Sequence, residues 1–158
     1  MKTHIQAIKS LAPEDYQLIE GEHLRLHGLL NNLHNTCCNL DNQLSCQSCG
    51  REKMASCQGQ LTCFIYNLTY LTDSHFHNEE FIMRHWPYVT EEYENFLKHQ
   101  NAHADIMDEL QKIVSECASL NKSVDVSEGY RQLYKRMSEL LKDHDRLFDD
   151  PFIQSTKS

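Results

Sequence analysis

Residues 75–87 read HFHNEEFIMRHWP, a stretch with three histidines and two adjacent glutamates that ends at a proline. Upstream of it, apolar residues recur with the 3.6-residue rhythm of an α-helix. Pro87 ends the helix because the residue before a proline avoids helical backbone angles. His75 and Glu79 share one helix face, since residues i and i+4 are neighbours there. The stretch predicts a helix over about 59–85 that presents either a solvated face or a metal site.

The same apolar rhythm continues outward from this helix along the chain. It occurs in three further segments, at about 13–35, 90–118 and 126–151. Pro13 suits a first helical turn, and Asp125 with Glu128 forms a capping-box pattern before the last segment. Apolar members of the four helices include Leu24, Leu26, Leu68, Leu97, Leu110, Leu133 and Leu147. The sequence therefore predicts an all-α fold in a single domain over 1–158.

The connections between the second, third and fourth helices are short, which makes neighbouring helices antiparallel. Glycine and proline are scarce, with 5 and 3 copies, and this favours helices over a sandwich or a barrel. We therefore expect an up-down-up-down four-helix bundle, with a long cysteine-rich loop at 36–58 between the first two helices.

The cysteine-rich loop is expected to have a function or a cross-link of its own, because unstructured connections of this length are uncommon. Cys46 and Cys49 have zinc-knuckle spacing, and two further thiolates would complete a tetrahedral site. The candidate zinc ligands are Cys37, Cys46, Cys49 and Cys57, with Cys38 and Cys63 as alternatives. A thiol–disulfide redox switch and plain free thiols stay open, and Cys117 is isolated.

The overall charge and hydropathy exclude several classes of partner. A net charge of −8 argues against nucleic-acid binding and against docking on an anionic membrane. No apolar run approaches the roughly 20 residues of a membrane span, and the N-terminus lacks the apolar core of a secretory signal. We expect a cytoplasmic protein, in which cysteines serve metal or redox chemistry more than disulfides.

Ligand-type side chains recur on every predicted helix. The first helix carries His23, the third carries His99 and His103 at a spacing of four, and the fourth carries His144 and Asp149. Any one of these residues can be explained as an ordinary side chain that is exposed or hydrogen-bonded. That explanation is poor for seven such groups spread over four helices. Imidazoles with bridging carboxylates are a ligand set for iron in helix bundles. Five histidines and two carboxylates would hold two irons and leave one coordination position open.

At these residues the chain resembles the hemerythrin family, whose members bind oxygen at a non-haem diiron centre. The family pattern is a histidine in helix one, H-F-x-x-E-E in helix two, H-x-x-x-H in helix three and H-x-x-x-x-D in helix four. This sequence reads IEGEHLRL around His23, HFHNEE from His75, HQNAH from His99 and HDRLFD from His144. The resemblance covers about residues 15–152 and leaves out the cysteine-rich loop.

The resemblance assigns a role to each matching position. The implied ligands are His99, His103 and His144 for one iron, His23 and His75 for the other, and Glu79 and Asp149 as bridges beside a solvent-derived oxygen. The second iron would be five-coordinate and open to oxygen. His77, Glu80 and His85 would be surface groups or lie just behind the ligands. The ferritin-like class is weaker, because it needs two E-x-x-H motifs and only Glu20 to His23 supplies one.

Two departures from the family concern the oxygen pocket. Asp145 stands where members often have isoleucine, and His27 stands where phenylalanine is common. Polar groups there would promote the loss of bound oxygen, and this loss would oxidise the irons. Such a pocket argues against stable oxygen transport and favours sensing or a reaction. The alternative is that both side chains point away from the pocket. Leu26 and Leu141 are also expected to line it.

Three functions follow from this resemblance. The preferred one is a sensory module for oxygen or redox state at the N-terminal side of a signalling output domain, with O2, NO, peroxide or azide as ligands. The second is a diiron enzyme, either a peroxidase, a nitric-oxide reductase or a ferroxidase. The third is oxygen storage. A homodimer is a further open possibility.

Overall fold

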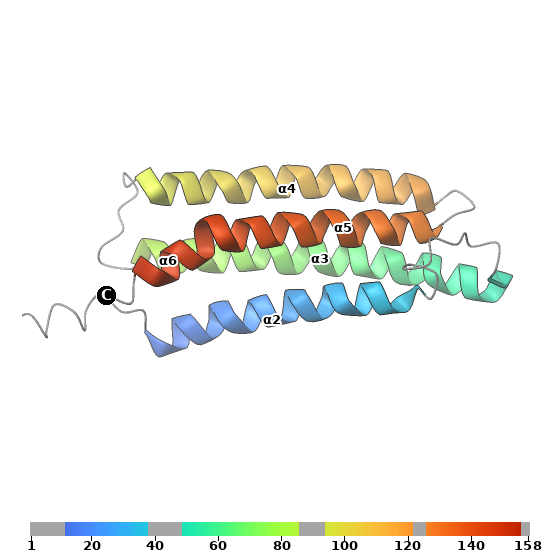
Figure 1. Cartoon of the computed structure of the whole chain (residues 1–158), viewed down its shortest axis with the longest axis horizontal. Helices are drawn as coiled ribbons and strands as arrows, with labels where there is room; N and C mark the ends of the chain where they lie inside the picture. The colour runs from blue at the N-terminus through green and yellow to red at the C-terminus, as the bar shows by residue number, and fades with distance from the viewer. Residues whose placement is uncertain (1–11, 38–48, 86–93, 122–125, 156–158) are drawn as a thin grey trace, which may run out of the picture.

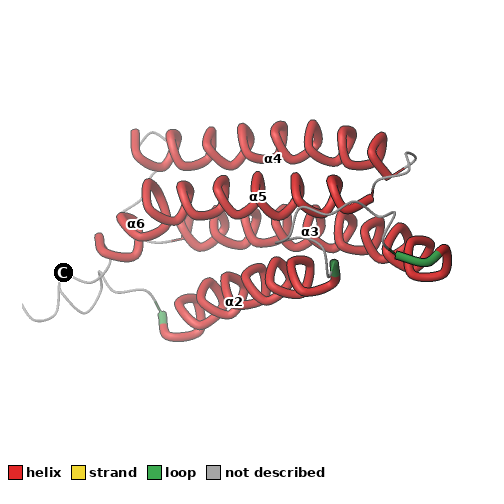
Figure 2. The backbone as a smooth tube through the Cα atoms, turned by 45° about the vertical axis from the view of Figure 1, so that its right-hand side comes forward, coloured by secondary structure: helices red, strands yellow, loops and turns green. Residues whose placement is uncertain are grey.

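The computed structural model describes residues 12–37, 49–85, 94–121 and 126–155, and these residues form helices and no strand. Four long helices lie side by side (Figure 1). They are α2 (Pro13–Thr36), α3 (Arg51–His85), α4 (Glu94–Asn121) and α5 (Val126–His144). A π-helix, η2 (Asp145–Asp149), and a short helix, α6 (Asp150–Ser155), continue α5, and the tube in Figure 2 follows them without a break. The prediction of an all-α fold is confirmed for the described residues.

Helix α2 matches its predicted bounds to within a residue. Pro13 occupies its first turn together with two acids, which the helix dipole favours there. Its buried apolar residues are Ile19, Leu26, Leu30 and Leu33. The prediction that Leu24 belongs to the apolar surface is wrong, because Leu24 is 71% exposed. It follows His23 directly and projects about 100° around the helix from it. Leu97 and Leu147 are exposed as well.

Helix α3 begins at Arg51, eight residues before the predicted start at 59, so the prediction of a loop over 36–58 is too long. Residues 51–58 are rich in good helix formers such as arginine, glutamate, methionine and alanine. Cys57 is buried one turn before the buried Leu61, so the apolar stripe continues toward the N-terminus. Cysteine counts as a small hydrophobe at such a position.

The last helix also extends further than predicted, because the chain stays helical through Pro151 to Ser155. Pro151 is the second residue of α6, and proline is tolerated in a first helical turn. Phe152 and Ile153 follow and are buried, so burial of two apolar side chains favours the continued helix. The predicted start of the third helix at 90 lies outside the described residues.

Two apolar clusters fill the bundle. The larger one is centred on Leu61, Leu68, Leu110, Tyr130 and Leu133. Within it the Tyr130 hydroxyl donates to the Cys57 carbonyl at 2.6 Å, so its buried polar atom is paired. The smaller cluster contains Ile19, Ile82, Met83, Phe96, Phe152 and Ile153. Along α2, α3, α4 and the continuous α5–η2–α6 segment, the buried histidines and acids fall between the residues of the two clusters, so they form a polar layer inside the bundle.

The chain ends of the helices alternate along the bundle. The end of α2 and the start of α3 lie at one end, together with the end of α4 and the start of α5, while α3 ends and α4 begins at the other (Figure 1).

None of the described helices combines the length and the apolar character needed to cross a membrane.

Candidate metal centre

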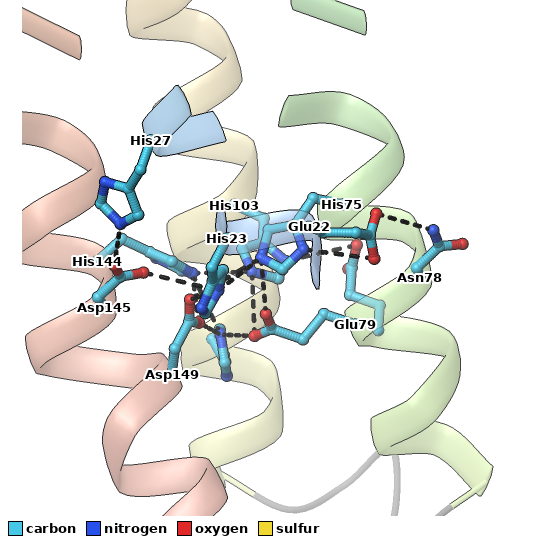
Figure 3. A network of polar contacts seen from close by, with 12 residues as sticks. Glu22, His23, His27, His75, Asn78, Glu79, His103, His144, Asp145 and Asp149 are labelled. Atoms are coloured by element: carbon cyan, nitrogen blue, oxygen red, sulfur yellow. Dashed lines mark hydrogen bonds and ion pairs between the residues drawn. The ribbon is translucent and has the colours of Figure 1, made fainter. Parts of the chain in front are cut away.

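The structure brings all seven predicted iron ligands together in the polar layer. Figure 3 labels each of them except His99. They come from α2, α3, α4, α5 and η2: His23, His75, Glu79, His99, His103, His144 and Asp149. Six of them are at most 3% exposed, and His23 is half-buried. Side chains separated by more than 120 residues therefore share one small volume of the core.

The seven residues form two overlapping ligand sets. One set contains Glu79, His99, His103, His144 and Asp149, and the other contains His23, His75, Glu79 and Asp149. Within each set, one ligand atom from every residue lies within 4.8 Å of all the others. Only the two carboxylates belong to both sets, so each of them sits between two groups of imidazoles.

Glu79 divides its two oxygens between the sets. Its Oε1 lies 2.6 Å from His99 Nε2, and its Oε2 lies 3.1 Å from His75 Nε2. The side chain is 1% exposed, and neither oxygen has a hydrogen-bond partner that meets normal geometry. A buried carboxylate in this state is costly unless a cation or a proton compensates it.

Asp149 is divided in the same way. Its Oδ1 lies 2.9 Å from His144 Nε2 and 3.0 Å from His99 Nε2, while its Oδ2 lies 3.1 Å from His23 Nε2. The π-helix η2 sets this position, because its wider turn places residues five apart on the same face. The π-helix was not predicted, although the five-residue spacing from His144 to Asp149 is a signal for it in the sequence.

The donor set fits a metal ion better than it fits hydrogen bonds alone. Imidazole Nε2 atoms approach one another at 3.0 Å between His23 and His75, at 3.0 Å between His103 and His144, and at 3.3 Å between His99 and His144. A neutral imidazole has one N–H, so five rings and two carboxylates facing one centre compete for few protons. A cation satisfies all these lone pairs at once, and nitrogen with oxygen donors suits iron, manganese or zinc.

When no metal is bound, protonated histidines balance the charge of the buried carboxylates. Burial lowers the pKa of His75, but the nearby carboxylates of Asp149, Glu22 and Glu79 outweigh it and raise the pKa to about 11. Burial is likewise outweighed at His99, where Asp149 raises the pKa to about 9. Burial and the positive charge of His99 lower the pKa of His103 to about 2. Two imidazolium ions beside two carboxylates thus supply the positive charge that a metal would bring.

Acids lie behind two of the imidazoles. Glu22 Oε1 is 3.6 Å from His75 Nδ1, and its Oε2 accepts a hydrogen bond from Asn78 Nδ2 at 3.1 Å. Glu80 Oε2 is 3.6 Å from His103 Nδ1. Carboxylates at this position orient a ligating imidazole and raise its basicity. Glu80 was expected at the surface or behind the ligands and lies behind them. Glu22 was not predicted as a site residue.

The remaining histidines of the 75–87 stretch take no part in the cluster. His77 and His85 are exposed, and the Nδ1 atom of each donates to the carbonyl four residues earlier, at 2.8 Å. These are local hydrogen bonds on a solvated helix face, as expected for the two residues.

Aromatic rings close the cluster off from the rest of the core. Phe76 stacks on His103, with ring centroids 4.0 Å apart and planes 9° apart. Phe148 packs against His99 and His144 at 5.3 and 5.4 Å. Such rings exclude water and fix the imidazole planes. Phe148 was not singled out from the sequence, since an apolar residue in a helix carries no signal of the ring that it will contact.

A small cavity of about 10 Å³ adjoins the cluster on the His23 side. This is the room of about one water molecule. The four predicted pocket residues all contribute to its wall: Leu26, His27, Leu141 and Asp145. Asp145 faces inward, with Oδ1 3.8 Å from His23 Nε2. The His27 side chain is 57% exposed and stands at the outer edge.

The predicted zinc ligands are only partly within the described residues. Cys46 lies outside them, and so does Cys38. Cys57 is buried in the larger apolar cluster, Cys37 packs against that cluster, and Cys49 is half-buried. In residues 12–37, 49–85, 94–121 and 126–155, no group of potential metal ligands includes a cysteine. The zinc site therefore stays a prediction, and Cys57 packs as a core residue of α3.

Comparisons of the chain with models of known protein families, with curated proteins and with solved structures found no match. What the site can do must therefore follow from its own residues.

Proposed function

We propose that this chain is a hemerythrin-like domain that holds two iron ions and binds oxygen or responds to redox state. The observation that carries the proposal is the division of Glu79 and Asp149, each of which points one oxygen at each group of imidazoles. Carboxylates in that position suit a pair of cations better than a single one. Histidine and bridging carboxylate ligands from four helices are the set used for paired iron in bundles.

The alternating helix ends support the up-down-up-down order that the short connections predict (Figure 1). In this arrangement one iron would be held by His99, His103 and His144, and the other by His23 and His75, with the two carboxylates shared. When bound, the irons would supply electrons to a small oxidant and take them back.

The protein side chains would hold both metal ions and leave one coordination position accessible to a small ligand. The set that includes His23 has four ligand residues and the other has five, so the coordination position that a small ligand can reach lies on the His23 side. The small cavity adjoins that side. Phe148 packs against two imidazoles of the other set, and Phe76 stacks on His103 and also lines the cavity. Glu22 and Glu80 lie 3.6 Å from the Nδ1 atoms of His75 and His103.

A sensory role fits the place of Asp149 in the chain. Asp149 ends η2, and α6 follows directly with two apolar side chains in the smaller cluster. A change of charge or ligand at the site would act on η2 and could shift α6, the last described element. We propose that this movement reaches a C-terminal signalling domain in a cytoplasmic protein, with O2, NO, peroxide or azide as the small ligand.

A diiron enzyme is the second candidate, favoured by one observation. Asp145 lines the cavity, and the exposed His27 stands at its outer edge, so polar side chains border the proposed oxygen position. Oxygen storage, the third candidate, would need a long-lived oxygenated state.

The test is the visible spectrum of iron-loaded protein that is reduced without air and then given a pulse of oxygen. A charge-transfer band that appears with oxygen and reverses on its removal supports binding or sensing. Direct conversion to the oxidised spectrum supports redox sensing or catalysis. Multiple turnovers of peroxide or nitric oxide would overturn the purely sensory role. Iron-loaded protein without any such band would overturn the diiron proposal.

A further inference from the structure

A groove leads from the surface toward the small cavity beside His23. It has a volume of about 540 Å³ and lies between α2 and the α5–η2–α6 segment. Its polar lining includes Asn31, Ser138, Lys142 and Arg146. The groove and the cavity share three wall residues, His27, Leu141 and Asp145. These three residues therefore form the partition between the solvent-facing groove and the metal-facing cavity.

Asp145 spans this partition with its two oxygens. On the inner side, Oδ1 is 3.8 Å from His23 Nε2, and on the outer side, Oδ2 is 3.9 Å from His27 Nε2 (Figure 3). The side chain is 27% exposed, so the carboxylate is partly withdrawn from water. Neither contact is short enough for a hydrogen bond. Both oxygens can therefore shift toward a stronger partner without breaking a short contact to either histidine.

The ligand set next to Asp145 is the smaller of the two. The set that includes His23 has four ligand residues, against five for the set that includes His103. One oxygen from Asp145 would raise the smaller set to five. Asp145 is the first residue of η2 and Asp149 is the last, so the same π-helix presents both carboxylates to this side of the cluster.

We propose that Asp145 is a further, displaceable ligand of the metal position held by His23 and His75, and that small anions entering through the groove exchange with it. This inference rests on the proposed two-metal site, but not on iron or oxygen chemistry. The exchange is a simple substitution, in which one carboxylate oxygen leaves as one anion donor enters. No electron moves, and a monovalent anion leaves the charge of the metal position unchanged.

The groove would select small anions by size. Lys142 and Arg146 place positive groups along it, and the carboxylates of Asp145 and Asp150 in the same lining balance their charge. The cavity behind Asp145 has room for about one water molecule. A triatomic anion such as azide would fit only by taking the place of the Asp145 carboxylate.

The experiment measures azide affinity in the oxidised, iron-loaded chain by its charge-transfer absorption. Wild type is compared with Asp145→Ala, which removes the competing donor, and with Asp150→Asn. Asp150 is exposed and lines the groove, so its variant removes the same negative charge without removing a proposed ligand. We expect Asp145→Ala to bind azide at least about tenfold more tightly than both, since the entering anion no longer displaces a carboxylate. Equal affinities in the two variants would overturn the inference.

A measurement on the wild-type chain covers the case in which Asp145→Ala does not load. Co²⁺ absorbs less strongly as its coordination number rises. In Co²⁺-loaded wild type, azide should leave the absorption intensity nearly unchanged, because one donor replaces another. A marked fall in intensity would mean that azide adds to an open position, and that Asp145 is no ligand. Uptake of fewer than two metal ions by the wild-type chain is a separate outcome, which would overturn the two-metal proposal itself.

Discussion

Asp149 lies five residues after His144 along the chain but one helical turn from it in space, with Asp149 Oδ1 2.9 Å from His144 Nε2. On an ordinary α-helix, a spacing of five would turn the second side chain about 140° away from the first. The π-helical turn at Asp145–Asp149 removes that difference. The carboxylate shared by both ligand sets therefore depends on one local departure from α-helical geometry.

Replacement of Asp149 by asparagine should weaken both metal positions. The change keeps the size of the side chain but removes the anion that faces His23 on one side and His144 on the other. We expect both metal affinities to fall more than about 100-fold, beyond the 10- to 100-fold typical of a residue behind a ligand. Metal content after dialysis, with Asp150→Asn as the matched control, provides the measurement. Retention of two metal ions by Asp149→Asn would contradict the bridging role.

Glu22→Gln should lower metal affinity without removing a ligand. Glu22 lies 3.6 Å from His75 Nδ1 and is 8% exposed, so the neutral amide would orient the ring less well and reduce its basicity. We expect a 10- to 100-fold loss of affinity, the usual effect of a carboxylate behind a histidine ligand. Competition with a chelator measures it. Glu20→Gln, two residues earlier on α2, makes the same change away from the cluster, and an equal loss there would refute the assignment.

Metal binding should release protons at neutral pH. In the metal-free chain, nearby carboxylates raise the pKa of His75 to about 11 and that of His99 to about 9, against the burial of both rings. Both rings hold a proton at pH 7 and must lose it to ligate a metal, so binding should release about two protons. Metal affinity should then rise with pH between 7 and 9. Calorimetry in two buffers of different ionisation enthalpy counts the protons, and a count near zero would exclude this scheme.

The stability of the metal-free chain should fall at alkaline pH. The folded-state pKa of His99, about 9, lies above its ordinary value of 6.5. Its stabilising contribution is therefore fully present below pH 6.5 and is lost as the pH rises through 9, by about 3 kcal/mol. Urea unfolding of chelator-treated protein at pH 6.5, 8 and 10 tests this. His99→Gln should make the dependence shallower between pH 6.5 and 9 and leave the part that His75 contributes, because the pKa of His75 is raised to about 11. An unchanged slope in that variant would count against the shift of His99.

Removal of apolar side chains should distinguish the core from the surface of the bundle. Leu68 is fully buried in the larger cluster, whereas Leu24 is 71% exposed. Leu68→Ala should reduce the free energy of unfolding by about 2–5 kcal/mol, and Leu24→Ala should change it by less than about 0.5 kcal/mol. Chemical denaturation of both variants makes the comparison. Similar losses in the two would mean that the helix faces are assigned wrongly.

Local patterns in the sequence were sufficient to predict the four long helices and the seven residues of the cluster. The bounds of α2 could be predicted because Pro13 and the apolar rhythm are signals contained within the helix itself. His99 and His103 could be paired because a spacing of four puts both on one face. The identity of the metal, its number and the response to oxygen remain predictions.

Only the tertiary structure decided the features that depend on contacts between helices. Helix α3 begins at Arg51 because Cys57 packs in a core built by other helices. The π-helix places Asp149 where α2, α3 and α4 already present their ligands, and Glu22 matters only because His75 arrives beside it from α3. A residue's own spacing predicts which side of its helix it occupies. What it meets on that side is decided by the packing of segments far apart in the chain, where burial and charge are set by all of them together.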